Sequence, residues 1–296
     1  MPASRRTMLA AAATSALAGC EGPASVASGG PSGSVASREA VGSGTLSHPP
    51  PTAPAAAPVV PAVTRAQIVA RYGRLKPHTW GFDAPGVVRA LPATQRVIAL
   101  TFDACGGRGG TGYDQSLIDF LRQREVPATL FLNSRWIDAN PAASRRLAGE
   151  PLFEIANHGT RHRPLSVTGR SAYGITGTRN AGEVYDEVAG NQIKLARLLG
   201  FAPRFFRSGT AYCDDIAARI VTALGERFVS FSVNGDGGAT FTPGQVRSAV
   251  TAAGDGSIVI CHMNHPERGT ARGIAAAVPY LLASGYRFVR LSDELR

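Results

Sequence analysis

Short apolar runs alternate with helical periods from about Arg65 to the end of the chain, and this alternation constrains the fold most strongly. Each run has the length and the β-branched content of a buried strand, and the segments between the runs place apolar residues three or four positions apart. Strands that alternate with helices build a parallel sheet covered by helices. The pattern therefore predicts one α/β domain over residues 65–296, with a parallel sheet that is open or closed into a barrel.

The same pattern locates the individual elements. We expect strands at residues 97–102, 128–132, 152–156, 203–206, 228–233, 257–261 and 287–291. We expect helices at residues 116–123, 142–147, 184–199, 216–224 and 246–252. A further helix should follow residue 261, and we expect Pro279 to kink or split it because proline lacks a backbone donor.

The first residues of the chain lack this alternation and indicate export. Arg5 and Arg6 precede a mild apolar run at residues 9–17, as in twin-arginine export signals, and this run is too short to span a bilayer. The run ends in Leu17-Ala-Gly-Cys20, which resembles a bacterial lipobox. We therefore expect a signal peptide over residues 1–19 and a lipid on Cys20 that anchors the exported protein to the periplasmic or outer face of a bacterial membrane. A cleaved signal with an incidental cysteine is the alternative.

Residues 20–64 consist mainly of Ala, Pro, Ser and Gly. Such a segment cannot bury enough apolar surface to offset its ordering entropy, so it predicts a disordered linker. The exported part keeps three cysteines, Cys105, Cys213 and Cys261. One disulfide with a free thiol and three free thiols both remain open.

The chain is basic, with 31 Lys and Arg against 21 Asp and Glu and a formal net charge of +10. The sequence contains no Lys/Arg run and no nucleic-acid motif, so we expect no nucleic-acid partner. An anionic lipid or cell-wall polymer is compatible with this charge, and so is a scattered solvated arginine surface.

Polar side chains follow the expected strands at the points where these strands end. They are Asp103, His158, His162, Arg207, Asn234, Asp236 and His262. Because the carboxyl ends of parallel strands meet at one rim, we expect a candidate metal hydrolase site there. His158 and His162 are four residues apart, and on a helical turn both could reach one metal ion. For Asn234 and Asp236, which lie in Asn-Gly-Asp-Gly-Gly, a structural turn is the alternative.

The order of these motifs resembles the NodB-homology polysaccharide deacetylases, carbohydrate esterases that remove N-acetyl or O-acetyl groups from glycans. The matching segments are Thr101-Phe-Asp-Ala-Cys105, His158-Gly-Thr-Arg-His162, Phe206-Arg-Ser-Gly-Thr-Ala-Tyr212, Asn234-Gly-Asp236 and Ile260-Cys-His262. The resemblance implies a distorted (β/α) barrel and a hydrolase of carbon–nitrogen bonds in linear amides. It implies a divalent metal, zinc with cobalt or nickel as alternatives, and an acetylated polysaccharide or peptidoglycan as partner.

The resemblance also assigns roles to individual residues. It implies that Asp103 is the general base, His262 the general acid and Arg207 the residue that holds the base. His158 and His162 become the metal-binding histidines, and Tyr212 and Asp236 become substrate-binding residues, Tyr212 through its backbone N–H.

One position departs from the family pattern. The first family motif is usually Thr-Phe-Asp-Asp, whose second Asp is the third metal ligand, but this chain has Ala104 there. Asp103, Asp236 and Cys105 are the possible substitutes, and a thiolate would suit zinc. We expect a two-histidine site completed by an oxygen ligand or water. The alternatives are a catalytically degenerate glycan-binding domain and a hydrolase of peptides or small amides on the same fold.

Overall fold

The computed structural model describes residues 61–92 and 95–295. The expected signal peptide, the expected lipid on Cys20 and nearly all of the expected linker lie outside the described residues. None of the described helices is both long enough and apolar enough to cross a lipid bilayer.

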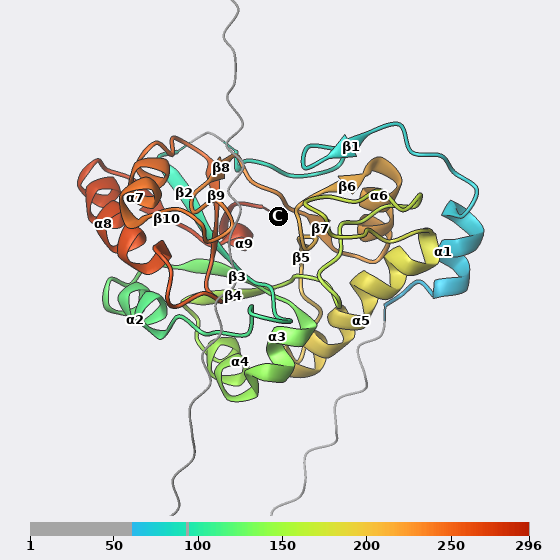
Figure 1. The fold of residues 1–296 in the computed structure, drawn as a ribbon, viewed down its shortest axis with the longest axis horizontal. Coiled ribbons are helices and arrows are strands. Elements are labelled where there is room, and N and C mark those ends of the chain that lie inside the picture. Colours follow the sequence, from blue (N-terminus) through green and yellow to red (C-terminus); the bar gives the residue numbers. More distant parts are fainter. Residues whose placement is uncertain (1–60, 93–94, 296) are drawn as a thin grey trace, which may run out of the picture. The chain divides into compact units, whose positions relative to one another are not determined.

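A curled parallel sheet forms the centre of the domain and confirms the expected (β/α)-barrel class (Figure 1). The strands follow the order β7-β5-β4-β3-β2-β9-β8, and β10 pairs with the start of β2. Their bounds are β2 Val97–Ala104, β3 Ala128–Leu132, β4 Phe153–Asn157, β5 Phe205–Phe206, β7 Arg227–Phe228, β8 Val233–Asn234, β9 Ser257–His262 and β10 Arg287–Phe288. All of these pairings are parallel, so the carboxyl ends of the strands share one rim. Separately, β1 Trp80–Gly81 pairs antiparallel with β6 Cys213–Asp214.

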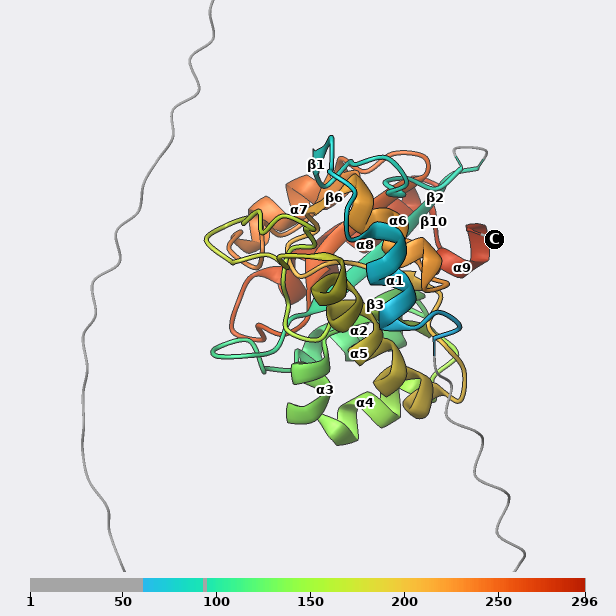
Figure 2. The same ribbon diagram turned by 90° about the vertical axis from the view of Figure 1, so that its right-hand side faces the viewer.

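Helices surround the sheet (Figures 1 and 2). They are α1 Arg65–Tyr72, α2 Gln115–Gln123, α3 Ser134–Ala139, α4 Pro141–Ala148, α5 Ala181–Leu199, α6 Asp215–Ala223, α7 Pro243–Thr251, α8 Thr270–Ala283 and α9 Leu291–Glu294. One apolar cluster packs α2, α7 and α8 against β2, β3 and β9. A second cluster packs α1, α5 and α6 against β5 and β7. The helices thus cover the outer face of the sheet and leave its inner face for the site.

Strand β2 shows how the pleat places the first site residue. All of its residues are buried, as expected for a central parallel strand. Leu100 packs in the outer cluster with the helices, whereas Ala99 belongs to a cluster enclosed by the sheet. Because successive side chains of a strand point to opposite faces, Asp103 lies on the inner face and Ala104 on the outer one. Ala104 is indeed a buried member of the outer cluster.

The strand expected at residues 228–233 is wrong. The structure has two strands there, β7 and β8, which lie at opposite edges of the sheet. The apolar run therefore crosses the gap between the two edges. Residues Val88 and Ala90 bridge the same gap, because Val88 pairs with Val229 and Ala90 with Ser257.

Two further expectations need correction near the C-terminus. Helix α8 runs from Thr270 to Ala283 as one element with Pro279 inside it, so the helix is not split there. Pro279 is exposed, so water can bond to the carbonyl that the proline ring leaves without a donor. The strand expected at residues 287–291 ends at Phe288, and α9 begins at Leu291.

Candidate active site

Four of the seven expected rim residues line one cavity of about 510 Å³. Its wall includes Asp103 from the end of β2, His162 from the loop after β4, and His262 from the end of β9. Asn234 and Cys105 also line it. Chain segments more than 100 residues apart thus deliver acidic, imidazole and thiol groups to one cavity.

A buried ion pair fixes Asp103. Its Oδ1 accepts a hydrogen bond of 2.7 Å from Nη1 of Arg207, whose side chain is fully buried. The guanidinium also donates to the carbonyls of Val229 and Ser230 and stacks 4.0 Å from the centre of the Phe131 ring. Because several partners fix Arg207, the carboxylate of Asp103 is held in one orientation, with Oδ2 lying 3.5 Å from Nε2 of His158.

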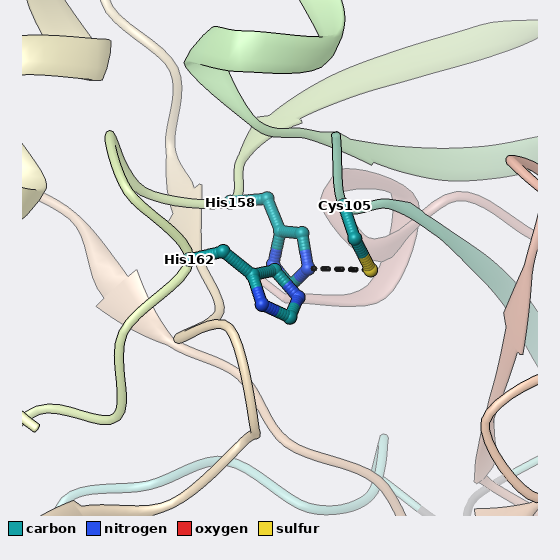
Figure 3. A group of neighbouring side chains, drawn as sticks. All are labelled: Cys105, His158 and His162. Carbon is teal, nitrogen blue, oxygen red and sulfur yellow. Dashed lines mark hydrogen bonds between the residues drawn. The ribbon is translucent and has the colours of Figure 1, made fainter. Parts of the chain in front are cut away.

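His158 and His162 lie together, but the expected helical turn is wrong. Gly159 and His162 both adopt left-handed backbone conformations, with φ of 78° and 61°, so the segment is a tight loop. The two rings meet nearly perpendicular, with centroids 5.0 Å apart (Figure 3). The buried carboxylate of Glu187 on α5 holds this loop by accepting hydrogen bonds from the backbone N–H groups of Arg161 and Arg163.

Cys105 completes a group of three donor atoms with these histidines (Figure 3). Its Sγ lies 3.7 Å from Nε2 of His158, and the three donor atoms lie within 4.8 Å of one another. Nδ1 of His158 donates to the carbonyl of Arg207 at 3.0 Å, which leaves Nε2 to face the thiol. Nε2 of His162 is buried and has no hydrogen-bond partner among the described residues. An unpartnered imidazole nitrogen beside a second one and a thiol fits a divalent metal such as zinc.

The surroundings of Cys105 favour its thiolate. Burial alone would raise the pKa of the thiol, but the adjacent imidazoles of His162, His158 and His262 outweigh burial and lower the pKa well below its usual value. Metals bind the thiolate form, so this environment suits a ligand.

His262 and Asp236 form a second buried pair. Nδ1 of His262 lies 2.9 Å from Oδ1 of Asp236, and its backbone N–H donates to Oδ2 at 2.7 Å. Burial opposes the charged imidazolium, but Asp236 outweighs this effect and raises the pKa of His262 well above its usual value. The expected substrate-binding role of Asp236 stays a prediction. Its side chain is fully buried and also accepts from Thr270, so in this structure both of its oxygens are bonded inside the protein.

The expected role of Tyr212 in substrate binding stays a prediction. The cavity is lined by Gly209, Thr210 and Ala211 from this segment. The backbone N–H of Tyr212 donates to Oγ1 of Thr210 at 3.4 Å, and its ring packs against Tyr173 and Trp80.

Two residues that the sequence did not lead us to expect hold the loop that carries His158 and His162. Asn133 donates to the carbonyls of His158 and Gly159, each at 2.8 Å. Glu187 lies one residue before Val188 on the buried face of α5. A charged residue on an apolar helix face was the available signal, because buried carboxylates need specific partners.

The fold and the rim residues define a hydrolase built on a curled (β/α) barrel. Residues 90–229 match the family model for polysaccharide deacetylase, and this match supports a NodB-homology carbohydrate esterase.

Individual relatives agree with this assignment. A peptidoglycan-N-acetylglucosamine deacetylase of Bacillus cereus is 28% identical over 214 residues, which cover 70% of this chain and 91% of that protein. The family 4 carbohydrate esterase PdaA of Bacillus subtilis has a similar structure, with a TM-score of 0.60 and 19% identity over 78% of this chain and 88% of that one. A family 4 pseudoenzyme of Bacillus anthracis has a TM-score of 0.61 and 18% identity, covering 72% and 70% of the two chains. At these identities the two solved structures show a shared fold.

Proposed function

We propose that this chain is a metal-dependent deacetylase that removes acetyl groups from N-acetylated, or O-acetylated, glycans of the cell wall or an exopolysaccharide. One observation carries the proposal. A single cavity joins a carboxylate fixed by arginine, a group of metal donors, and a histidine charged by a buried aspartate. These three groups are a base, a site for a Lewis acid and a general acid. Metal-assisted amide hydrolysis uses all three.

Each residue group has a separate task in this reaction. His158 and His162 would hold a divalent ion, which would polarise an acetyl carbonyl and lower the pKa of water from about 15.7 toward 7. Asp103, which Arg207 keeps oriented, accepts a proton from the attacking water. His262 is protonated because of Asp236 and gives its proton to the departing amine.

An aromatic wall beside the cavity suits the sugar rings of a polymer. We use this name for Trp80, Phe82, Tyr173, Tyr212 and Phe231, whose rings contact one another with centroids 5.4–5.8 Å apart. Tyr173 and Phe231 line the cavity, and Tyr173 is 77% exposed. An exposed aromatic face next to a reaction site offers apolar contact to rings that flank the acetylated sugar.

The relative from Bacillus cereus suggests the first substrate. Its name specifies N-acetylglucosamine in peptidoglycan, so we propose peptidoglycan or a chitin-type oligomer as substrate for this chain. Such a substrate lies outside the cytoplasm, which agrees with the proposed export signal and lipid on Cys20. Cys20→Ser should yield a form that separates from the membrane fraction or stays unprocessed. Membrane attachment that survives this change and high salt would contradict the anchor.

Acetate release tests the enzymatic proposal directly. Purified full-length chain should release acetate from peptidoglycan or N-acetylglucosamine oligomers when Zn²⁺ or Co²⁺ is added, and Asp103→Asn should slow this release by about 10²–10⁴-fold. An absence of acetate across a broad set of glycans and acetate esters, with metal binding intact, would overturn the proposal.

A second candidate function is glycan binding without turnover. Two observations favour it: Ala104 replaces the family ligand, and a pseudoenzyme shares the fold. Glycan binding by the parent chain without acetate release, unchanged in His158→Ala, would support this alternative.

A further inference from the structure

We propose that Cys105 is the third protein ligand of the metal, so that sulfur replaces the carboxylate implied by the family pattern and the site prefers thiophilic ions. The inference rests on the proposed function only in taking a divalent ion to bind at His158 and His162. It adds a ligand, an ion class and a spectroscopic signature that the proposed reaction does not require.

The geometry matches a tetrahedral zinc site. Zinc–sulfur bonds of about 2.3 Å and zinc–nitrogen bonds of about 2.0–2.1 Å separate a sulfur from a nitrogen by about 3.6 Å at the tetrahedral angle. The observed distance from Sγ of Cys105 to Nε2 of His158 is 3.7 Å. A hydrogen bond between the thiol and the imidazole has a similar length, so the distance alone does not distinguish it from a pair of metal ligands. The second observation is Nε2 of His162, which is buried without a hydrogen-bond partner among the described residues, on a histidine of the same donor group.

The oxygen ligand expected from the sequence has a weaker candidate than Cys105. Within the described residues, no Asp or Glu joins the group of three donor atoms. Both oxygens of Asp236 are bonded to His262. Oδ1 of Asp103 is bonded to Arg207, and its Oδ2 lies 3.5 Å from Nε2 of His158 but does not belong to the group of three donor atoms. Ala104 belongs to the outer apolar cluster, so even a longer side chain there would start from the face of β2 opposite Asp103. Cys105, just beyond the end of the strand, supplies the donor that Ala104 lacks.

A thiolate changes which ions the site selects. Soft sulfur donors favour zinc, cadmium and cobalt, whereas carboxylate-rich sites also accept hard ions such as manganese and magnesium. We therefore expect Zn²⁺ to displace Mn²⁺ from this chain even when the concentration of Zn²⁺ is far below that of Mn²⁺. A carboxylate at position 105 should reduce this preference for Zn²⁺ by at least about tenfold.

Cobalt spectroscopy tests the inference without reference to activity. Titration of the full-length chain with CoCl₂ should produce an intense near-ultraviolet band from sulfur-to-cobalt charge transfer, together with the visible bands of tetrahedral cobalt. Cys105→Ser and Cys105→Asp should lack the near-ultraviolet band. Cys213→Ala is the matched control, because Cys213 is a buried thiol outside the cavity, and it should keep the band. Competition with ZnCl₂ and MnCl₂, followed by calorimetry, gives the selectivity of each variant.

The outcomes separate this inference from the proposed function. Cobalt binding without the sulfur band, or a band that survives Cys105→Ser, would overturn the ligand assignment and leave metal-dependent deacetylation intact. Acetate release that persists after chelation, with an acetyl adduct on Cys105 in mass spectrometry, would instead identify the thiol as a nucleophile and overturn both. A sulfur band in a chain that releases no acetate would support the ligand and contradict the enzyme.

Discussion

Glu187→Gln should weaken metal binding although this residue contacts no metal donor directly. The carboxylate is 3% exposed and accepts from the backbone N–H of Arg161 at 2.9 and 3.0 Å and from that of Arg163 at 3.2 Å. These bonds fix the loop between His158 and His162. Glutamine has the same shape, but its amide nitrogen cannot accept a hydrogen bond and its oxygen carries no full charge, so the N–H of Arg161 loses one of its two acceptors and the remaining bonds lose their charge assistance.

The size of the effect follows from these contacts. A hydrogen bond to a charged group contributes about 1.5–3 kcal/mol, and a loss of about 2 kcal/mol corresponds to roughly 30-fold in affinity. Loss of a partner that orients metal ligands typically costs about 10–100-fold. We therefore expect the Kd for Zn²⁺ to rise by up to about 30-fold, with kcat at saturating metal changing much less.

Calorimetric titration with Zn²⁺ measures this change. Asp186→Asn is the matched control, because it removes a negative charge from the adjacent position of α5, but its side chain is half-exposed and pairs with Arg65 on the surface. Two results would contradict this reasoning: a Kd for Zn²⁺ that changes less than threefold in Glu187→Gln, and a Kd that changes equally in both variants. Either result would refute the role of Glu187 in holding the loop and show that Asn133 and the backbone alone fix it.

Asp103→Asn should lower kcat by about 10²–10⁴-fold, and the unpaired charge of Arg207 should also reduce the free energy of unfolding by about 3–5 kcal/mol, which denaturant titration can check. Asp236→Asn should lower the pKa of His262, because Asp236 is what raises it. Activity is lost at high pH, where His262 is no longer protonated, so this loss should move to lower pH in the profile of kcat/KM. A high-pH loss that stays in place would exclude His262 as the acid. Tyr173→Ala should raise KM for glycan polymers roughly fivefold, from about 1 kcal/mol of lost stacking, and leave a small acetate ester unaffected. Burial raises the pKa of Glu226 well above its usual value. As pH rises above about 4.5, the Glu226 carboxyl therefore keeps its proton in the folded state and loses it in the unfolded state, so the free energy of unfolding should fall. Glu226→Gln should flatten this dependence in thermal melts between acid and neutral pH.

The sequence predicted the strands that are long and continuously apolar. Strand β2 is buried along its whole length, and its composition alone distinguishes it from a helix. Strands of two residues, such as β7 and β8, give no periodicity, and their apolar run instead looked like one longer strand. Which edge of the sheet each joins depends on tertiary packing that local propensity does not contain.

The site residues were predictable as a set, but their contacts were not. Asp236 and Asp103 both follow apolar runs, yet one is bonded to His262 inside the protein and the other lines the cavity. The helical spacing of His158 and His162 suggested the right pair for the wrong reason, because the loop relies on positive φ at a histidine, which propensity does not predict.

The segment that bridges the gap between the sheet edges sets an order of events in folding. Val88 pairs with Val229 and Ala90 with Ser257, and we call these two pairings the seam. The seam joins positions that are more than 140 residues apart. Pairings of such sequence separation form slowly, because the chain must lose loop entropy before the contact stabilises it. During synthesis the seam cannot close until Ser257 has left the ribosome, long after β2, β3 and β4 can pair. These two pairings are therefore expected to form after the central strands β2, β3 and β4 have paired.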